Sequence, residues 1–232
     1  MSVKIRKDIE QIADEIIATR RDIHKHPELS FDVYRTAGIA AERLTELGMD
    51  VQTGIGKTGV VGDLKCGDGP TIALRADMDA LPIQETGEID YISQNDGVMH
   101  ACGHDGHTAM LLGAAKVLAD NKDKIKGTVR FLFQPAEEGA GGARYMIEDG
   151  CLEGVDEVYG IHLWNYQKYG EVGVKEGPIL AAADEFEINI KGLGGHGATP
   201  QGSVDAVVVS AHLITALQTI VSRNTNPLES TV

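Results

Sequence analysis

Short apolar runs alternate along most of the chain with segments whose apolar residues recur at helical spacing. Residues 71–74, 129–133 and 157–161 are apolar runs typical of buried strands. Between the first two runs, residues 107–119 place apolar side chains on one face of a helix. Strands that alternate with helices predict an α/β domain with a largely parallel sheet.

Three further segments precede the first of these strands. Residues 8–24 and 36–47 each show an amphipathic helical pattern, with Pro27 beyond the first helix and Gly48 as the expected cap of the second. Residues 51–70 are punctuated by glycine and predict short strands and turns.

Polar side chains follow the expected strands, at the point where each strand ends. Asp77 and Asp79 follow the first, Glu137 and Glu138 the second, and His162 the third. Ligands of open α/β sheets bind outside the carboxyl ends of the strands. The pattern therefore brings metal-ligand or acid/base chemistry to one edge of the sheet.

The segment of residues 99–107 adds three imidazoles, a thiol and a carboxylate within nine residues. Cys102 and His104 lie two apart, so in a loop both side chains are able to face one way. An isolated pair of this kind is more often a polar loop. With Glu138 and His162 it completes four ligand-competent groups, a donor set that suits Zn and also admits Mn, Co or Ni.

Several neighbouring polar residues have more than one interpretation. Glu137, adjacent to the expected ligand Glu138, is left free to move a proton, as metal-assisted amide hydrolysis requires. Asp79 either caps a helix or, as we favour, orients a metal ligand by contacting the side of it that does not bind the metal. The role of Asp77 is left open, and Arg75 is expected to form a structural ion pair.

The overall composition excludes some classes of partner. The 232 residues carry 21 basic and 35 acidic side chains, and the net charge of -14 argues against nucleic acid and membrane surfaces. Three widely spaced cysteines do not suggest a disulfide framework. We find no signal-peptide pattern and expect no run long enough to span a membrane, so we expect a cytoplasmic protein.

The character of the sequence changes at Asp184. Residues 184–191 alternate apolar and polar side chains, which predicts a strand with one wet face, and residues 203–222 predict a helix. The intervening glycines match G-x-G-x-x-G, but a half-exposed strand and Pro200 argue against a dinucleotide site. The turn instead presents His196. We expect two domains, residues 1–183 and 184–232.

Five segments in order resemble the metal-dependent aminoacylase and carboxypeptidase family, and most closely its hippurate hydrolase and indole-acetyl-amino-acid hydrolase branch. They are residues 21–31, 74–82, 99–107, 133–139 and 194–200. The resemblance implies an α/β metallohydrolase catalytic domain with an inserted α+β lid domain. It also implies a two-metal amidohydrolase that cleaves N-acyl amino acids, either hippurate-like or N-acetylated.

Residue roles follow from the same resemblance. It makes Cys102, His104, Glu138 and His162 metal ligands and Glu137 the general base and acid. His196 on the lid would stabilise the oxyanion, and the lid would form a homodimer. The substrate would be a small-molecule N-acyl amino acid.

Family members continue beyond the position where these 232 residues stop, and their further sequence supplies a last histidine ligand. We therefore expect a fold truncated at its C-terminus, weak or single-site metal binding, and little activity. Two alternatives stay open. One is a catalytically incompetent fragment that acts as a metal-binding or dimerisation module. The other is a structural metal site, against which the free Glu137 argues.

Overall fold

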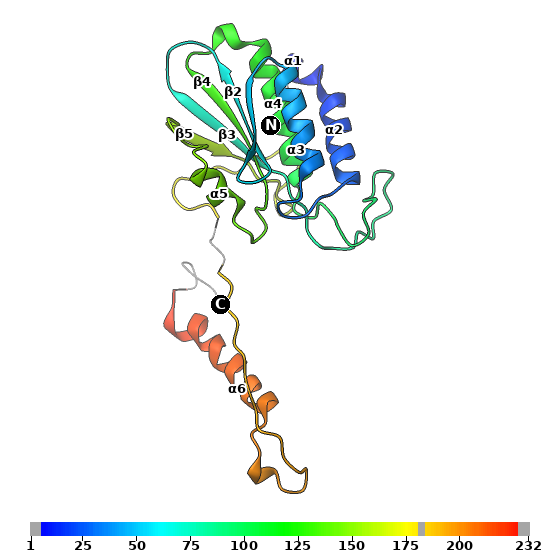
Figure 1. The fold of residues 1–232 in the computed structure, drawn as a ribbon, viewed down its shortest axis with the longest axis vertical. Coiled ribbons are helices and arrows are strands. Elements are labelled where there is room, and N and C mark those ends of the chain that lie inside the picture. Colours follow the sequence, from blue (N-terminus) through cyan, green and yellow to red (C-terminus); the bar gives the residue numbers. More distant parts are fainter. Residues whose placement is uncertain (1–5, 181–183, 227–232) are drawn as a thin grey trace. The chain divides into compact units, whose positions relative to one another are not determined.

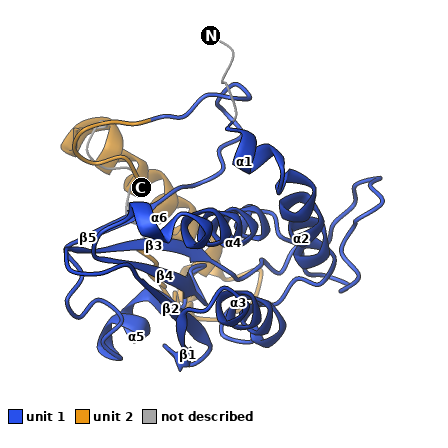
Figure 2. Ribbon diagram, turned by 90° about the horizontal axis from the view of Figure 1, so that it is seen from above, with its two compact units in different colours: residues 1–173 blue, residues 174–232 orange. Residues whose placement is uncertain are grey.

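The computed structural model describes residues 6–180 and 184–226. The chain divides into two compact units, residues 1–173 and 174–232, shown in different colours in Figure 2. The domain boundary expected near residue 183 falls on residues 181–183, which lie outside the described part of the chain.

A five-stranded mixed sheet forms the centre of the first unit (Figure 1). β3 pairs in parallel with β4 and β5, whereas β2 pairs antiparallel with β1 and β4. Four strands therefore run in one direction and only β2 opposes them, which confirms the expected parallel-leaning sheet. In spatial order the strands are β1 (Asp50–Ile55), β2 (Gly59–Lys65), β4 (Thr128–Gln134), β3 (Thr71–Asp77) and β5 (Glu157–Gly160).

Helices lie on both faces of this sheet. The helix expected over residues 8–24 is split in two near Gln11, where one turn interrupts it. Gly48, at φ 74°, ends the next helix in the left-handed region as expected. The helices are α1 (Lys7–Glu10), α2 (Ala13–Lys25), α3 (Tyr34–Glu46), α4 (His104–Asp120), the 3₁₀ turn η1 (Lys122–Lys124) and α5 (Gly142–Glu148).

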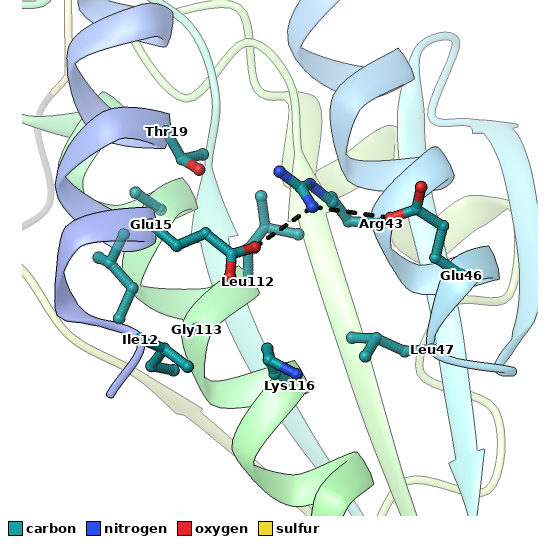
Figure 3. Close-up of a pocket in the computed structure, with 11 residues that line it drawn as sticks. Ile12, Glu15, Thr19, Arg43, Glu46, Leu47, Leu112, Gly113 and Lys116 are labelled. Atoms are coloured by element: carbon teal, nitrogen blue, oxygen red, sulfur yellow. Dashed lines mark ion pairs between the residues drawn. The ribbon is translucent and has the colours of Figure 1, made fainter. Parts of the chain in front are cut away.

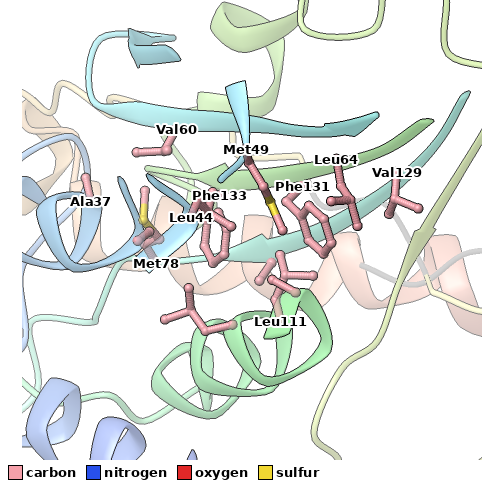
Figure 4. Packing of buried hydrophobic residues seen from close by; sticks show 14 of the residues in the cluster. Ala37, Leu44, Met49, Val60, Leu64, Met78, Leu111, Val129, Phe131 and Phe133 are labelled. Atoms are coloured by element: carbon pink, nitrogen blue, oxygen red, sulfur yellow. The ribbon is translucent and has the colours of Figure 1, made fainter. Parts of the chain in front are cut away.

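Successive side chains of β4 point to opposite faces and so belong to different apolar clusters. Phe131 and Phe133 are fully buried in a cluster with Leu44 of α3 and Leu111 of α4 (Figure 4). Leu132, between them, packs in a smaller cluster with residues of α5 and the segment after it. The larger core thus holds α4, which begins with the expected ligand His104, against the sheet.

The strand expected over residues 157–161 forms, but the prediction that it is buried is wrong. Val158 and Tyr159 are 50% and 54% exposed. β5 is an edge strand whose only ladder partner in the described residues is β3. An apolar run does not reveal whether a neighbour covers the strand, and here no described element does.

The second unit contains α6 (Ala206–Thr219), which is preceded by the 3₁₀ turn η2 (Pro200–Gly202) and continues as the π-helical turn η3 (Ile220–Asn224). Asp205 caps α6 by accepting hydrogen bonds from two backbone N–H groups at 2.8 and 3.3 Å. The strand expected over residues 184–191 is not formed. A strand needs a ladder partner, and the described residues offer this segment none.

The helical segment Ala206–Asn224 is long and apolar enough, by length and composition alone, to cross a membrane, with a mean hydropathy of 1.4. By length and composition, therefore, the expectation that no apolar run is long enough to span a membrane is wrong. The same composition also suits a helix that packs against protein, and none of this segment is buried within the described residues.

Replacing Phe131 with Ala should lower the free energy of unfolding by about 3–5 kcal/mol, because the fully buried ring would leave a cavity between the sheet and α4. Urea unfolding followed by circular dichroism measures the loss. Ile147→Ala is the control, since Ile147 is 52% exposed and should change stability by less than about 1 kcal/mol. Equal losses for the two variants would contradict this packing.

Candidate metal centre

The structure brings the four expected ligands and Glu137 together around His104. The ligand atoms of Cys102, His104 and His162 all lie within 4.8 Å of one another, and so do those of His104, Glu137 and Glu138. The Cys102 Sγ atom is 3.4 Å from His162 Nε2. Each cluster has the spacing needed to hold a cation.

The topology explains why residues so distant in sequence meet. β3, β4 and β5 are parallel, so their carboxyl ends lie at the same edge of the sheet. Asp77 is the last residue of β3, Glu137 follows β4, and His162 follows β5. α4 begins at the same edge with His104, three positions before the helix expected from residue 107.

Asp79 connects the imidazole to the paired carboxylates. Its side chain is buried and accepts backbone N–H groups from Glu137 at 3.0 Å and Glu138 at 3.1 Å. One of its oxygens also lies 3.4 Å from His104 Nδ1. This geometry fits a carboxylate that orients a ligand, and not a helix cap.

The loop that carries the paired carboxylates has a fixed backbone. Ala136 adopts φ 52°, a left-handed conformation that is uncommon outside glycine. Its N–H donates to the Ser30 carbonyl at 3.0 Å, and its carbonyl accepts the Gly142 N–H at 2.9 Å. A Cβ at Gly142 would lie 1.7 Å from the Pro135 oxygen, so only glycine fits there.

His107 forms two contacts at this site that the sequence pattern did not predict. Its Nδ1 lies 2.6 Å from Asp77 Oδ1, and its Nε2 accepts the Leu163 N–H at 2.9 Å. Because Nε2 accepts, Nδ1 carries the proton and donates to Asp77. His107 therefore ties α4 to the segment that carries His162. Its signal in the sequence was its place three residues after His104, on the same helix face.

Asp77 is held as a carboxylate. Burial raises its pKa, but the hydrogen bond from His107 and the charge of Arg75 outweigh burial and lower the pKa to about 2. Arg75 Nη1 lies 2.6 Å from Asp77 Oδ2, which is the ion pair expected for Arg75. Asp77 thus contacts His107 and Arg75 and also lies 3.6 Å from His104 Nε2.

The centre contains buried polar atoms that lack a hydrogen-bond partner among the described residues. These atoms are both ring nitrogens of His104 and one oxygen of Glu138. Burial and the negative charge of Glu138 raise the pKa of Glu137. Unpartnered buried polar atoms are costly, and a divalent cation bound by the Glu138 oxygen and one nitrogen of the neutral His104 ring would satisfy those two atoms. The thiol, imidazole and carboxylate donors fit Zn and related first-row ions.

His196 lies in the second unit and is described by itself. Its side chain is exposed, and Nδ1 accepts the Ala198 N–H at 3.1 Å within the turn that precedes η2. Its expected contact with an oxyanion stays a prediction.

The cavity of about 240 Å³ between α2, α3 and α4 is distinct from this centre (Figure 3). Arg43 projects into it and pairs with Glu15 at 3.2 Å and Glu46 at 3.6 Å. None of its lining residues belongs to the metal cluster.

Cys102 should be alkylated slowly in the metal-free chain, because burial and the hydrogen bond and charge of Glu138 raise the pKa of its thiol to about 12. The thiolate that reacts is then scarce at pH 8, and the rate should still rise above pH 10. Mass spectrometry of iodoacetamide labelling measures the rate, with the partly buried Cys66 as internal reference.

Glu138→Gln should accelerate labelling of Cys102 and leave Cys66 unchanged, because the substitution removes the charge that disfavours the thiolate. Labelling of Cys102 as fast as Cys66 at pH 8 in the unsubstituted chain would contradict the geometry.

Comparison with known proteins identifies the family of the chain. Residues 73–231 match the model of peptidase family M20/M25/M40. The chain is 48% identical to an N-acyl-L-amino acid amidohydrolase of Geobacillus stearothermophilus, over 99% of this chain and 62% of the relative. It is 47% identical to an N-acetyl-L-cysteine deacetylase of Bacillus subtilis, over 97% of this chain and 54% of the relative.

Solved structures give the same result. A protein from methicillin-resistant Staphylococcus aureus superposes with a TM-score of 0.81 at 40% identity, covering 97% of this chain and 60% of that one. A dinuclear metal binding peptidase of the M20 family from Bacillus subtilis superposes with a TM-score of 0.70 at 47% identity, covering 73% of this chain and 48% of that one. The 232 residues thus span little more than half the length of these relatives, and the chain belongs to peptidase family M20/M25/M40.

Proposed function

We propose that this chain carries the catalytic centre of a metal-dependent amidohydrolase that cleaves N-acyl amino acids to a carboxylic acid and an amino acid. The observation that carries the proposal is Glu137, a carboxylate of raised pKa beside a set of ligand-competent side chains. The relatives named above as an amidohydrolase and a deacetylase act on the same kind of bond.

We propose that Cys102, His104, Glu138 and His162 hold two divalent ions from among Zn, Mn, Co and Ni. A divalent metal supplies Lewis-acid polarisation of the amide carbonyl and lowers the pKa of water. Three or four protein ligands per ion are usual. The four residues therefore satisfy one ion fully or two ions incompletely, and the second site is expected to be the weaker.

Glu137 is proposed to move the proton. It takes a proton from the attacking water and returns it to the leaving amine, and the raised pKa of Glu137 favours that proton transfer. Asp79 supports this role, because its two oxygens fix the backbone N–H groups of Glu137 and Glu138. His196 is proposed to donate to the oxyanion, a contact worth about 3–4 kcal/mol in other enzymes.

Residues 184–232 are proposed to form part of a lid that mediates a homodimer. The apolar side chains of α6, such as Val207 and Ile214, are exposed within the described residues and are available to a partner. The acidic net charge of -14 supports a small-molecule substrate and not nucleic acid. We propose a cytoplasmic location on the same composition.

The experiment that tests the function measures bound metal and hydrolysis in one preparation of the purified chain. After loading with Zn²⁺ or Mn²⁺, we expect one tightly bound ion per chain and weak, metal-dependent hydrolysis of N-acetyl or N-benzoyl amino acids. Cys102→Ala should abolish the tight binding, because it removes the thiolate ligand. Metal binding that survives Cys102→Ala would overturn the site, and binding without any hydrolysis would favour the metal-binding module.

Glu137→Ala should lower turnover by about 10²–10⁴-fold and leave the bound metal unchanged, because the residue moves a proton and holds no ion. Steady-state kinetics and metal analysis of the same sample measure both effects. Glu88→Ala, at an exposed position in the segment between β3 and α4, is the matched control. Loss of metal together with turnover would instead identify Glu137 as a ligand.

A further inference from the structure

A second cluster of ionisable side chains is buried beside the first turn of α4. His24, 3% exposed, places Nδ1 2.7 Å from Asp105 Oδ2 and Nε2 3.0 Å from Glu85 Oε1. Arg20 Nε lies 2.7 Å from the same oxygen of Asp105. None of these four residues is among the expected metal ligands, and the proposed reaction uses none of them.

The contacts fix the charge of His24. A carboxylate only accepts hydrogen bonds, so both ring nitrogens of His24 must donate and the ring is an imidazolium. The hydrogen bond to Asp105 is the largest cause that raises the pKa of His24, and burial opposes it. His24 and the partly exposed Arg20 then balance Asp105 and Glu85, which offsets the free-energy cost of burying His24 and the two carboxylates.

His24 joins three separate segments of the chain. It lies in the last turn of α2, and Asp105 is the second residue of α4. Glu85 belongs to the long segment between β3 and α4, and its other oxygen accepts the Ser93 N–H at 2.7 Å. The Gln94 N–H donates to the carbonyl of the residue after His24 at 2.8 Å, which fixes the same segment to the end of α2.

The turn of residues 102–104 depends on these contacts for its position. Gly103, the N-cap of α4, adopts φ 88° and provides no side-chain cap. The first turn of α4 is therefore held by contacts with other elements. On one side Thr108 donates to a backbone carbonyl of β3 at 2.9 Å, and on the other side Asp105 binds His24.

We propose that His24 is a positioning residue of the metal centre, which acts through Asp105 to fix the ligand-bearing turn of residues 102–104. Its effect on metal rests on the proposed function, whereas its effect on the turn rests only on the contacts above. Loss of a direct hydrogen-bond partner of a metal ligand typically costs 10–100-fold in metal affinity, and His24, which acts one residue further away through Asp105, should cost about the lower end of that range.

Amide hydrogen exchange of the metal-free chain tests the positioning directly. In His24→Gln and His24→Leu, exchange should become faster in residues 100–108 and stay unchanged in β4. His26→Gln is the matched control, because the His26 side chain lies at the same helix end but contacts Asp22 and none of the four residues of the cluster. Unchanged exchange in residues 100–108 would overturn the proposal. So would a uniform increase along the chain, or unfolding of both His24 variants.

Cobalt binding tests the consequence for metal. Titration with Co²⁺, followed by the thiolate-to-cobalt absorption of Cys102, should show at least tenfold weaker binding in His24→Leu. In an Asp105→Asn background the same substitution should cost less than twofold, because the two residues act as one unit. If His24→Leu weakens Co²⁺ binding by the same factor with and without Asp105→Asn, His24 does not act through Asp105 and the proposal fails. If the unsubstituted chain binds no Co²⁺, the proposed function fails, and hydrogen exchange still decides the role of His24.

Discussion

Negative charge concentrated around one buried imidazole is the constraint on which the rest of this site depends. Four carboxylates, those of Asp77, Asp79, Glu137 and Glu138, have an oxygen within 3.9 Å of a His104 ring nitrogen. Buried carboxylates must be paired or hydrogen-bonded. Arg75 and two backbone N–H groups compensate part of this charge, and His104 still keeps unpartnered nitrogens. The remainder is the part that a bound cation would balance.

Positions at the strand ends could be predicted because they depend on local pattern. Asp77, Glu137 and His162 each follow an apolar run, and parallel strands bring such positions to one edge whatever the detailed packing. Pairing between distant segments is not local, and there the predictions fail. The apolar run of β5 gave no indication that it forms an exposed edge, and the alternation over residues 184–191 did not show whether a partner strand exists.

Supporting contacts were missed for the same reason. His107 meets Asp77 across 30 positions, and His24 meets Asp105 across 81. The residue types alone suggested chemistry, but three histidines within nine residues do not reveal which of them bind metal and which orient the others. Hydrogen bonding distinguishes His107 from the other two, because both of its ring nitrogens have hydrogen-bond partners, whereas those of His100 and His104 have none among the described residues. Only His104 of these two lies among carboxylates, at 3.4–3.9 Å.

The two sides of the first turn of α4 differ in how their polar side chains are satisfied. Facing the sheet edge, His104 keeps its nitrogens free, which costs stability in the absence of a cation. Facing α2, one oxygen of Asp105 accepts short contacts from Arg20 and His24, which fix its position whether or not a metal is present. A helix with a glycine N-cap at φ 88° has no cap of its own to hold that turn. The contacts of Asp105 can therefore hold His104 in position before any metal is bound.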